Sequence, residues 1–132
     1  MLLVLSSNAF GSSSCPLNGI YRADGARTLA SYQETHTLES DDERSEWQAM
    51  FSALTIEWRC DRFRGWSECG KQAPCPITDG WQQAEVTQSS ESEWRVHFPS
   101  GIDDDWRLVT EGNCYRIERI SRGLYWEYFC RK

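Results

Sequence analysis

The chain has 132 residues and a formal net charge of −6, from 14 Lys and Arg against 20 Asp and Glu. This length is enough for one domain with a buried core, and the acidic balance argues against nucleic acid or an anionic membrane as partner, because both attract basic surfaces. Seven Trp, five Tyr and five Phe are many for so short a chain. Since aromatic residues favour strands, the composition indicates a globular domain rich in β-structure.

Residues 1–14 differ from the rest of the chain. A short apolar run, Met1 to Leu5, precedes small polar residues, and Ala9-Phe10-Gly11 is similar to a signal-peptidase site. The apolar run is shorter than the core of a signal peptide, and no Lys or Arg precedes it. We interpret residues 1–14 as a truncated signal-like or flexible leader and residues 15–132 as a single disulfide-stabilised domain. No other stretch is apolar enough to span a membrane.

A first strand at 16–21 and two helices are predicted next. Asp24 is a suitable N-cap for a helix over 26–34. Ser40 and Glu43 have the spacing of a capping box for the second helix. Its apolar stripe has helical spacing and is expected to pack over the sheet, because a lone helix must bury such a stripe. The stripe consists of Trp47, Met50, Phe51 and Leu54.

After Thr55 the spacing of the apolar residues changes from a helical period to every second residue. Ile56, Trp58 and Cys60 alternate with charged residues and predict a half-buried strand. Residues 65–79 are expected to be irregular, because Pro74-Cys75-Pro76 cannot continue a central strand. Two further strands are predicted at 81–88 and 94–99.

The last twenty-seven residues, 106–132, predict a three-stranded antiparallel meander. Gly112-Asn113 suits a two-residue turn with Gly first, and Ser121-Arg122-Gly123 suits a three-residue turn ending in Gly. With these turns, Cys114 lies directly opposite Cys130, within reach of a disulfide. The same register places Arg107 opposite Glu118.

The cysteine pattern indicates disulfides. Six Cys are present, and no pair has the C-x2-C spacing of a zinc site. Disulfides imply an oxidising compartment, such as a periplasm or the cell exterior. Besides the predicted Cys114–Cys130 pair, four cysteines remain whose pairing the sequence leaves open. They are Cys15, Cys60, Cys69 and Cys75, and two bridges tying the N-terminus and one loop to the sheet are the simplest arrangement.

These elements predict an α+β fold, because the helices come early and the strands follow. We expect N-terminal helices packed on a strongly curved antiparallel β-meander or a small β-barrel of about six to seven strands. Gly19-Ile20-Tyr21-Arg22-Ala23-Asp24 and the late Glu127-Tyr128-Phe129 resemble the ends of small exported bacterial proteins of lipocalin-like appearance. That resemblance implies a fold and a compartment rather than an activity.

The sequence predicts no catalytic, metal or cofactor site. His36 falls in a linker and His97 on a strand, and neither is near a recognisable nucleophile motif. Asp103-Asp104-Asp105 lacks the ligand spacing of an EF-hand and is interpreted as a solvated turn.

Binding surfaces are therefore the remaining candidates. One face of the meander interleaves aromatic residues with charges, and it is either a second buried layer or an exposed recognition surface, where Trp, Tyr and Arg carry most of the binding energy. Phe63 and Trp66, beside the Cys-containing loop, form the second candidate. The binding residues we single out are Phe63, Trp66, Arg107, Arg116, Trp126 and Tyr128.

The leading functional hypothesis is an exported, non-catalytic binding protein that recognises another protein, such as a basic enzyme or toxin, in the manner of a periplasmic inhibitor or immunity protein. The alternative is a lipocalin-like binder of small ligands or glycans, with aromatic rings lining a cavity or platform. An empty apolar centre would favour this alternative, and a filled centre would count against it. The oligomeric state is left open.

Overall fold

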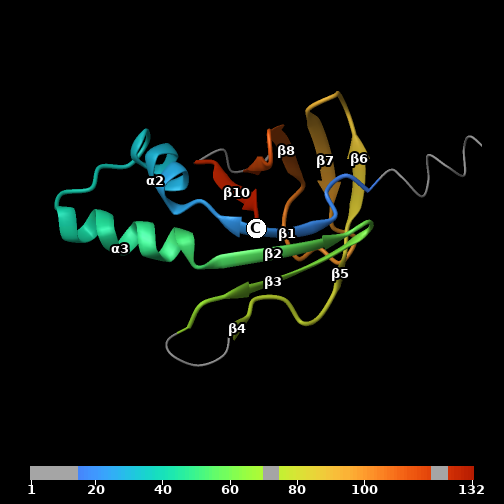
Figure 1. The fold of residues 1–132 in the computed structure, drawn as a ribbon, viewed down its shortest axis with the longest axis horizontal. Helices are drawn as coiled ribbons and strands as arrows, with labels where there is room; N and C mark the ends of the chain where they lie inside the picture. Colours follow the sequence, from blue (N-terminus) through green and yellow to red (C-terminus); the bar gives the residue numbers. More distant parts are fainter. Residues whose placement is uncertain (1–14, 70–74, 120–124) are drawn as a thin grey trace, which may run out of the picture.

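The computed structural model describes residues 15–69, 75–119 and 125–132. The expected leader at 1–14 and the expected turn at Ser121-Arg122-Gly123 lie outside the described residues. Within the described ranges the chain forms two helices and ten strands (Figure 1). The helices are α2 (Gly25–Gln33) and α3 (Asp41–Ser52). The strands are β1 (Gly19–Ala23), β2 (Leu54–Arg59), β3 (Arg62–Ser67), β4 (Cys75–Pro76), β5 (Gln82–Gln83), β6 (Glu85–Gln88), β7 (Glu93–His97), β8 (Trp106–Glu111), β9 (Cys114–Arg119) and β10 (Glu127–Arg131).

All strands belong to one strongly curled antiparallel sheet. Its order is β4-β3-β2-β1-β10-β9-β8-β7-β6, and β5 pairs with β3. Since only Ala84 separates β5 from β6, the segment 82–88 joins β3 on one side of the curl to β7 on the other. The predicted α+β class with a strongly curved sheet is confirmed.

The predicted number of six to seven strands is too low. β3 and β4 fall partly or wholly in the segment 65–79 that we expected to be irregular, and the expected strand 81–88 is divided at Ala84. The alternation of apolar and polar residues along β3 is hard to recognise in the sequence, because Gly65 occupies an inward-facing position where an apolar side chain would be expected. β4 has only two residues and lies at the edge of the ladder, where Pro76 is tolerated.

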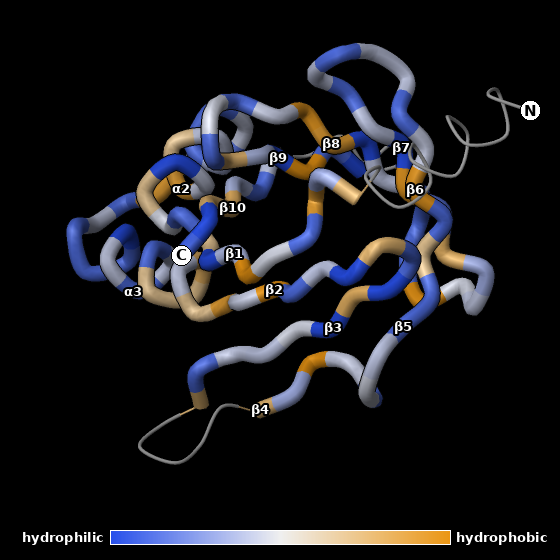
Figure 2. Tube along the Cα trace, turned by 45° about the vertical axis from the view of Figure 1, so that its right-hand side comes forward, coloured by the Kyte–Doolittle hydropathy of each residue, from blue (hydrophilic) through white to orange (hydrophobic). Residues whose placement is uncertain are grey.

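The interior of the curl is filled with side chains. Trp58, Tyr115 and Phe129 are each exposed by only 1%, and Val96 and Leu108 by 0%. Figure 2 shows apolar and polar positions alternating along these strands, as expected for a sheet with one buried face. The rest of this core comprises Leu17, Tyr21, Ile56, Phe63, Ala84, Trp94, Phe98, Trp106 and Ile117.

The predicted meander register is present. Glu111 pairs with Cys114 around Gly112, whose φ of 60° is of the kind that glycine adopts without strain. Cys130 faces Cys114, and Arg107 faces Glu118.

Three disulfides connect the described cysteines. Cys114 is bonded to Cys130 within the meander, the pairing predicted from the register. The Cys15–Cys60 bridge ties the N-terminal segment to the β2–β3 turn, and the Cys69–Cys75 bridge closes the loop between β3 and β4. Disulfides in a small domain are typical of an oxidising environment.

The helices form a hairpin at one end of the curl (Figure 1). Asp24 caps α2 by accepting from the Arg27 N–H, and Ser40 caps α3 by accepting from the Glu43 N–H. Gly25 allows the two helices to approach closely, because a Cβ there would lie 2.6 Å from the Gln48 carbonyl oxygen.

The predicted stripe of the second helix is only partly buried. Phe51 is 8% exposed, but Met50 is 52% exposed and Leu54 belongs to β2. The stripe does not lie across the sheet, because α3 packs mainly on α2. Tyr32 of α2 fills the contact between the helices, with its ring centroid 4.7 Å from Trp47 and 5.5 Å from Phe51.

The opposite end of the curl is covered by the segment that precedes β1. Residues 16–18, expected as strand, instead form a turn in which the Asn18 N–H donates to the Cys15 carbonyl. Leu17 inserts into the core at 5% exposure. The Arg131 guanidinium donates to the carbonyl oxygens of Pro16 and Asn18, each at 2.6 Å, and so holds this segment in place.

Candidate functional site

Four of the six predicted binding residues lie together on the outer face of β8–β10. Arg107 is on β8, Arg116 on β9, and Trp126 and Tyr128 lie at or just before β10. Arg116 pairs across the sheet with Tyr128. We call this surface, consisting of Arg107, Arg116, Trp126 and Tyr128, the meander face. Since its opposite side forms the filled core, the meander face is the solvent-facing side of the sheet and not a second buried layer.

The charges of the meander face are paired with one another. Arg107 lies 3.2 Å from Glu118 and also contacts Glu93, while Arg116 lies 2.7 Å from Glu118 and 2.9 Å from Glu111. The hydrogen bond from Arg107 lowers the pKa of the Glu93 carboxyl below its usual range. These arginines therefore have few free donors for a ligand.

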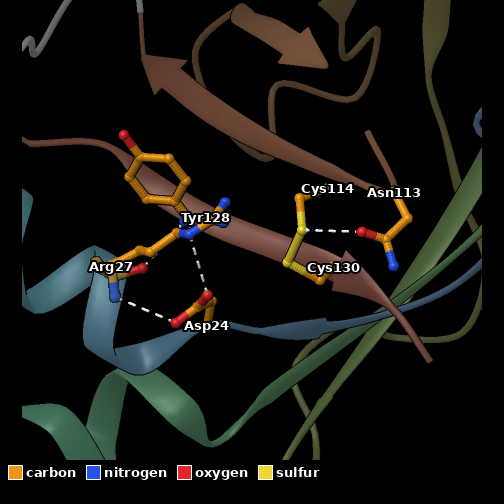
Figure 3. Close-up of a disulfide and its surroundings, with 7 residues drawn as sticks. Asp24, Arg27, Asn113, Cys114, Tyr128 and Cys130 are labelled. Atoms are coloured by element: carbon orange, nitrogen blue, oxygen red, sulfur yellow. Dashed lines mark hydrogen bonds and ion pairs between the residues drawn. A yellow bond between two sulfur atoms is a disulfide. The ribbon is translucent and has the colours of Figure 1, made fainter. Parts of the chain in front are cut away.

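Aromatic rings cover part of this ion-pair network. The Arg116 guanidinium lies 4.2 Å from the Trp126 ring centroid, and Trp126 is 37% exposed. Figure 3 shows Tyr128 and the Cys114–Cys130 disulfide along β10, with Asp24 and Arg27 from the start of α2 beside them. Burial raises the pKa of the Tyr128 hydroxyl. The meander face is thus a rigid, internally neutralised surface.

Phe63, which we singled out as a binding residue, lies in the core and not on an exposed surface. It is 4% exposed, and its ring packs against Trp58 and Phe98, each with centroids 5.3 Å away. Side chains alternate along β3, so Phe63 points into the core.

Trp66 does lie on the outer face of β3, together with Arg62 and Arg64. Arg59, which pairs with Arg62 across the β2–β3 hairpin, adds a third guanidinium. Trp81, which precedes β5, approaches from a segment distant in sequence. We call this group, Arg59, Arg62, Arg64, Trp66 and Trp81, the arginine–tryptophan cluster.

The three guanidiniums of this cluster surround one indole. Their central carbons lie 4.3 Å (Arg64), 5.5 Å (Arg59) and 5.9 Å (Arg62) from the Trp81 ring centroid. Arg64 also lies 4.9 Å from the Trp66 ring. Such cation–π contacts hold guanidinium planes in fixed orientations. Sequence reasoning missed Trp81 and Arg59; the alternation of Arg62, Arg64 and Trp66 was a visible signal, but no local pattern connects it to Trp81.

Negative charge is concentrated on the helical hairpin. Residues 34–46 contain six carboxylates against one cation, Arg44, which amounts to −5 of the net −6. We call this region the acidic pole. Its carboxylates are Glu34, Glu39, Asp41, Asp42, Glu43 and Glu46, and all but Glu43 are exposed.

The two histidines lie in separate, unrelated surroundings. The His97 Nδ1 is 2.7 Å from an Asp105 carboxylate oxygen, and this hydrogen bond raises the pKa of the exposed imidazole. His36 stacks on Tyr32 with ring centroids 3.9 Å apart. Among the described residues, no group of three His, Cys, Asp or Glu side chains is arranged to hold a metal ion.

Comparison with known proteins gives no relative: no protein family, curated protein or solved structure matches the chain. In the part of the chain that the structure describes, neither helix has the length and apolar character needed to cross a membrane.

Proposed function

We propose that this chain is an exported, non-catalytic binding protein that recognises another protein. The observation that carries the proposal is the contrast between its interior and its surface. The interior is filled by side chains such as Trp58, Tyr115 and Phe129, whereas Trp, Tyr and Arg residues are gathered on the outside of a disulfide-bonded sheet. Such residues dominate the binding energy of protein interfaces, and a rigid scaffold lowers the entropic cost of binding.

The acidic pole supports a basic partner. Five of its six carboxylates are exposed, so its field extends into solvent and would accelerate encounter with a positively charged protein. This chemistry fits a periplasmic inhibitor or immunity-type protein that neutralises a basic cell-wall hydrolase or toxin. The resemblance of the chain ends to small exported lipocalin-like bacterial proteins points to the same compartment.

The proposal is tested by titrating the oxidised protein against a set of basic cell-wall hydrolases, with a c-type lysozyme included, by calorimetry and by inhibition of cell-wall lysis. The informative variant combines the substitutions Glu39→Gln, Asp42→Asn and Glu46→Gln. These three carboxylates are chosen because none of them takes part in an ion pair within the described residues. We expect binding at low salt and a loss of about tenfold or more in affinity for this variant.

The matched control combines the substitutions Asp79→Asn, Glu85→Gln and Glu91→Gln. These three acids are exposed and lie outside the acidic pole. The control removes the same charge and should leave affinity nearly unchanged. Absence of binding to every basic hydrolase, or equal weakening by both variants, would contradict the proposed role of the acidic pole.

A small-ligand or glycan binder is the second candidate. A shallow hollow on the outer side of β1–β3, lined by Ile20, Thr55 and Trp66 among others, favours it, since sugar rings bind on exposed aromatic side chains. Binding of neutral oligosaccharides that is abolished by Trp66→Ala and unaffected by salt would favour this function over the first.

A further inference from the structure

We propose that the arginine–tryptophan cluster is a second binding site, which takes an acidic peptide segment of a partner protein. The site goes beyond the proposed role of the acidic pole, because its charge is opposite and its position is different. Figure 1 shows α2 and α3 at one end of the molecule and the β2–β3 turn at the other. The acidic pole and the guanidiniums near the β2–β3 turn are thus separated along the molecule.

The guanidiniums of the cluster are held in fixed orientations, but many of their N–H donors remain open to solvent. Glu57 lies beneath them with its side chain only 13% exposed, 2.9 Å from Arg64 and 3.7 Å from Arg59. Asp61 is 3.9 Å from Arg62. Arg59 and Arg62 remain 66% and 58% exposed. Since each guanidinium has five N–H donors, most donors of these two side chains are open to a ligand.

The cluster therefore differs from the meander face, where Arg116 is only 19% exposed and contacts two carboxylates. Stacking on Trp81 restricts each guanidinium before any ligand binds, which reduces the entropy lost on binding. The fork of N–H groups at the free edge of a guanidinium matches a carboxylate in bidentate geometry.

The apolar surroundings and the overall charge favour a peptide over a polyanion. Ile20 is 42% exposed and pairs across the sheet with Glu57, on the same outer face as the cluster. Ile20 and Trp66 together line a shallow hollow beside the guanidiniums. A segment that carries both carboxylates and apolar side chains would match these neighbours. An extended polyanion such as nucleic acid or an anionic membrane would also meet the rest of a surface with a net charge of −6. A short acidic segment has to contact only the guanidiniums of the cluster.

The test uses a fluorescein-labelled peptide of alternating Glu and Leu, and a matched peptide with Gln in place of Glu, in anisotropy titrations with the oxidised full chain. Arg59→Gln and Arg62→Gln are each expected to weaken binding of the Glu peptide by about fivefold to tenfold, because these two side chains carry the open donors. Arg95→Gln is the matched control, because Arg95 is exposed on β7 and removing it changes the net charge equally. It should leave the affinity within about twofold.

Arg62→Lys separates geometry from charge. It keeps the cation but loses the planar fork, so we expect weakening close to that of Arg62→Gln. Trp81→Ala should also weaken binding, because the guanidiniums lose the ring that orients them. Full retention of affinity in Arg62→Lys, or equal losses in Arg95→Gln and Arg62→Gln, would overturn the proposal in favour of unspecific charge attraction.

Two further outcomes identify a different occupant and would also overturn the proposal. Tighter binding of heparin or inorganic phosphate than of the Glu peptide would assign the cluster to a polyanion or to free phosphate. Salt-sensitive self-association in sedimentation, lost in Arg62→Gln, would assign it to the acidic pole of a second copy. Since the acidic-pole variant keeps the cluster intact, the two proposals can fail independently.

Discussion

The indole Nε1–H of Trp58 donates to the hydroxyl oxygen of Tyr115, 3.0 Å away, across the interior of the curled sheet. The two residues lie on β2 and β9, and each is only 1% exposed. Burial raises the pKa of the Tyr115 hydroxyl, so that it stays protonated and accepts from the indole as a neutral group. Both polar atoms of this pair are thus satisfied inside an otherwise apolar core.

Tyr115→Phe is expected to lower the free energy of unfolding by about 1–3 kcal/mol, because it leaves the buried Trp58 N–H without a partner. Urea denaturation of the oxidised protein, followed by circular dichroism, measures this change. Tyr128→Phe serves as the control, since Tyr128 is on the outer face, and it should shift the free energy by about 0.5 kcal/mol or less. Equal effects of the two substitutions would show that the internal hydrogen bond is not significant.

The three disulfides are expected to differ in their contribution to stability according to the loops that they close. Their sequence separations are 45 for Cys15–Cys60, 16 for Cys114–Cys130 and 6 for Cys69–Cys75. Loop-closure entropy then predicts losses of about 4, 3 and 2 kcal/mol when each pair is replaced by serines. Denaturation of the three double variants measures the ranking, and non-reducing peptide mapping checks the pairing. A different set of cystine peptides would contradict the fold.

Phe63 and Trp66 lie on opposite faces of β3 and are expected to lose different amounts of stability on substitution. Phe63→Ala should cost about 3–5 kcal/mol of stability, because it opens a cavity in the core. Trp66→Ala should cost about 1 kcal/mol, since the side chain is only half-buried and its main ring contact is with Arg64. Denaturation gives the first effect, and the peptide titration described above gives the binding effect of the second. A Trp66 variant as unstable as the Phe63 variant would contradict the outward orientation of Trp66.

His97 is expected to titrate above its ordinary pKa of about 6.5. The hydrogen bond to Asp105 is the main cause, and the nearby Glu85 carboxylate adds to it. Because the folded-state pKa is raised, the pair stabilises the fold fully below the unfolded pKa, and this contribution is lost as the pH rises through the folded pKa. An NMR titration of the His97 ring measures the pKa, and Asp105→Asn should lower it. An unchanged pKa in that variant would contradict the hydrogen bond.

Much of the local structure could be predicted from the sequence. Asp24 and Ser40 cap the helices as expected, because capping depends on a side chain and backbone groups within three residues. The β8–β9 register follows from the Gly112-Asn113 turn. The facing of Cys114 and Cys130 agrees with the register predicted from the expected three-residue turn at 121–123. These are short-range relations, and they are encoded by neighbouring residues.

Only the tertiary structure decided which residues face the core and which come together on the surface. Period-two alternation separates Phe63 from Trp66 but does not say which of them faces the core; that depends on how strands from distant parts of the chain close around the interior. For the same reason Met50 is exposed although its spacing is helical, since α3 packs on α2 and not across the sheet. Trp81 joins Arg59, Arg62 and Arg64 only because β5 pairs with β3. The sequence by itself determined the caps, the meander register and the acidic segment, whereas the arginine–tryptophan cluster was created by long-range strand pairing, which no local pattern records.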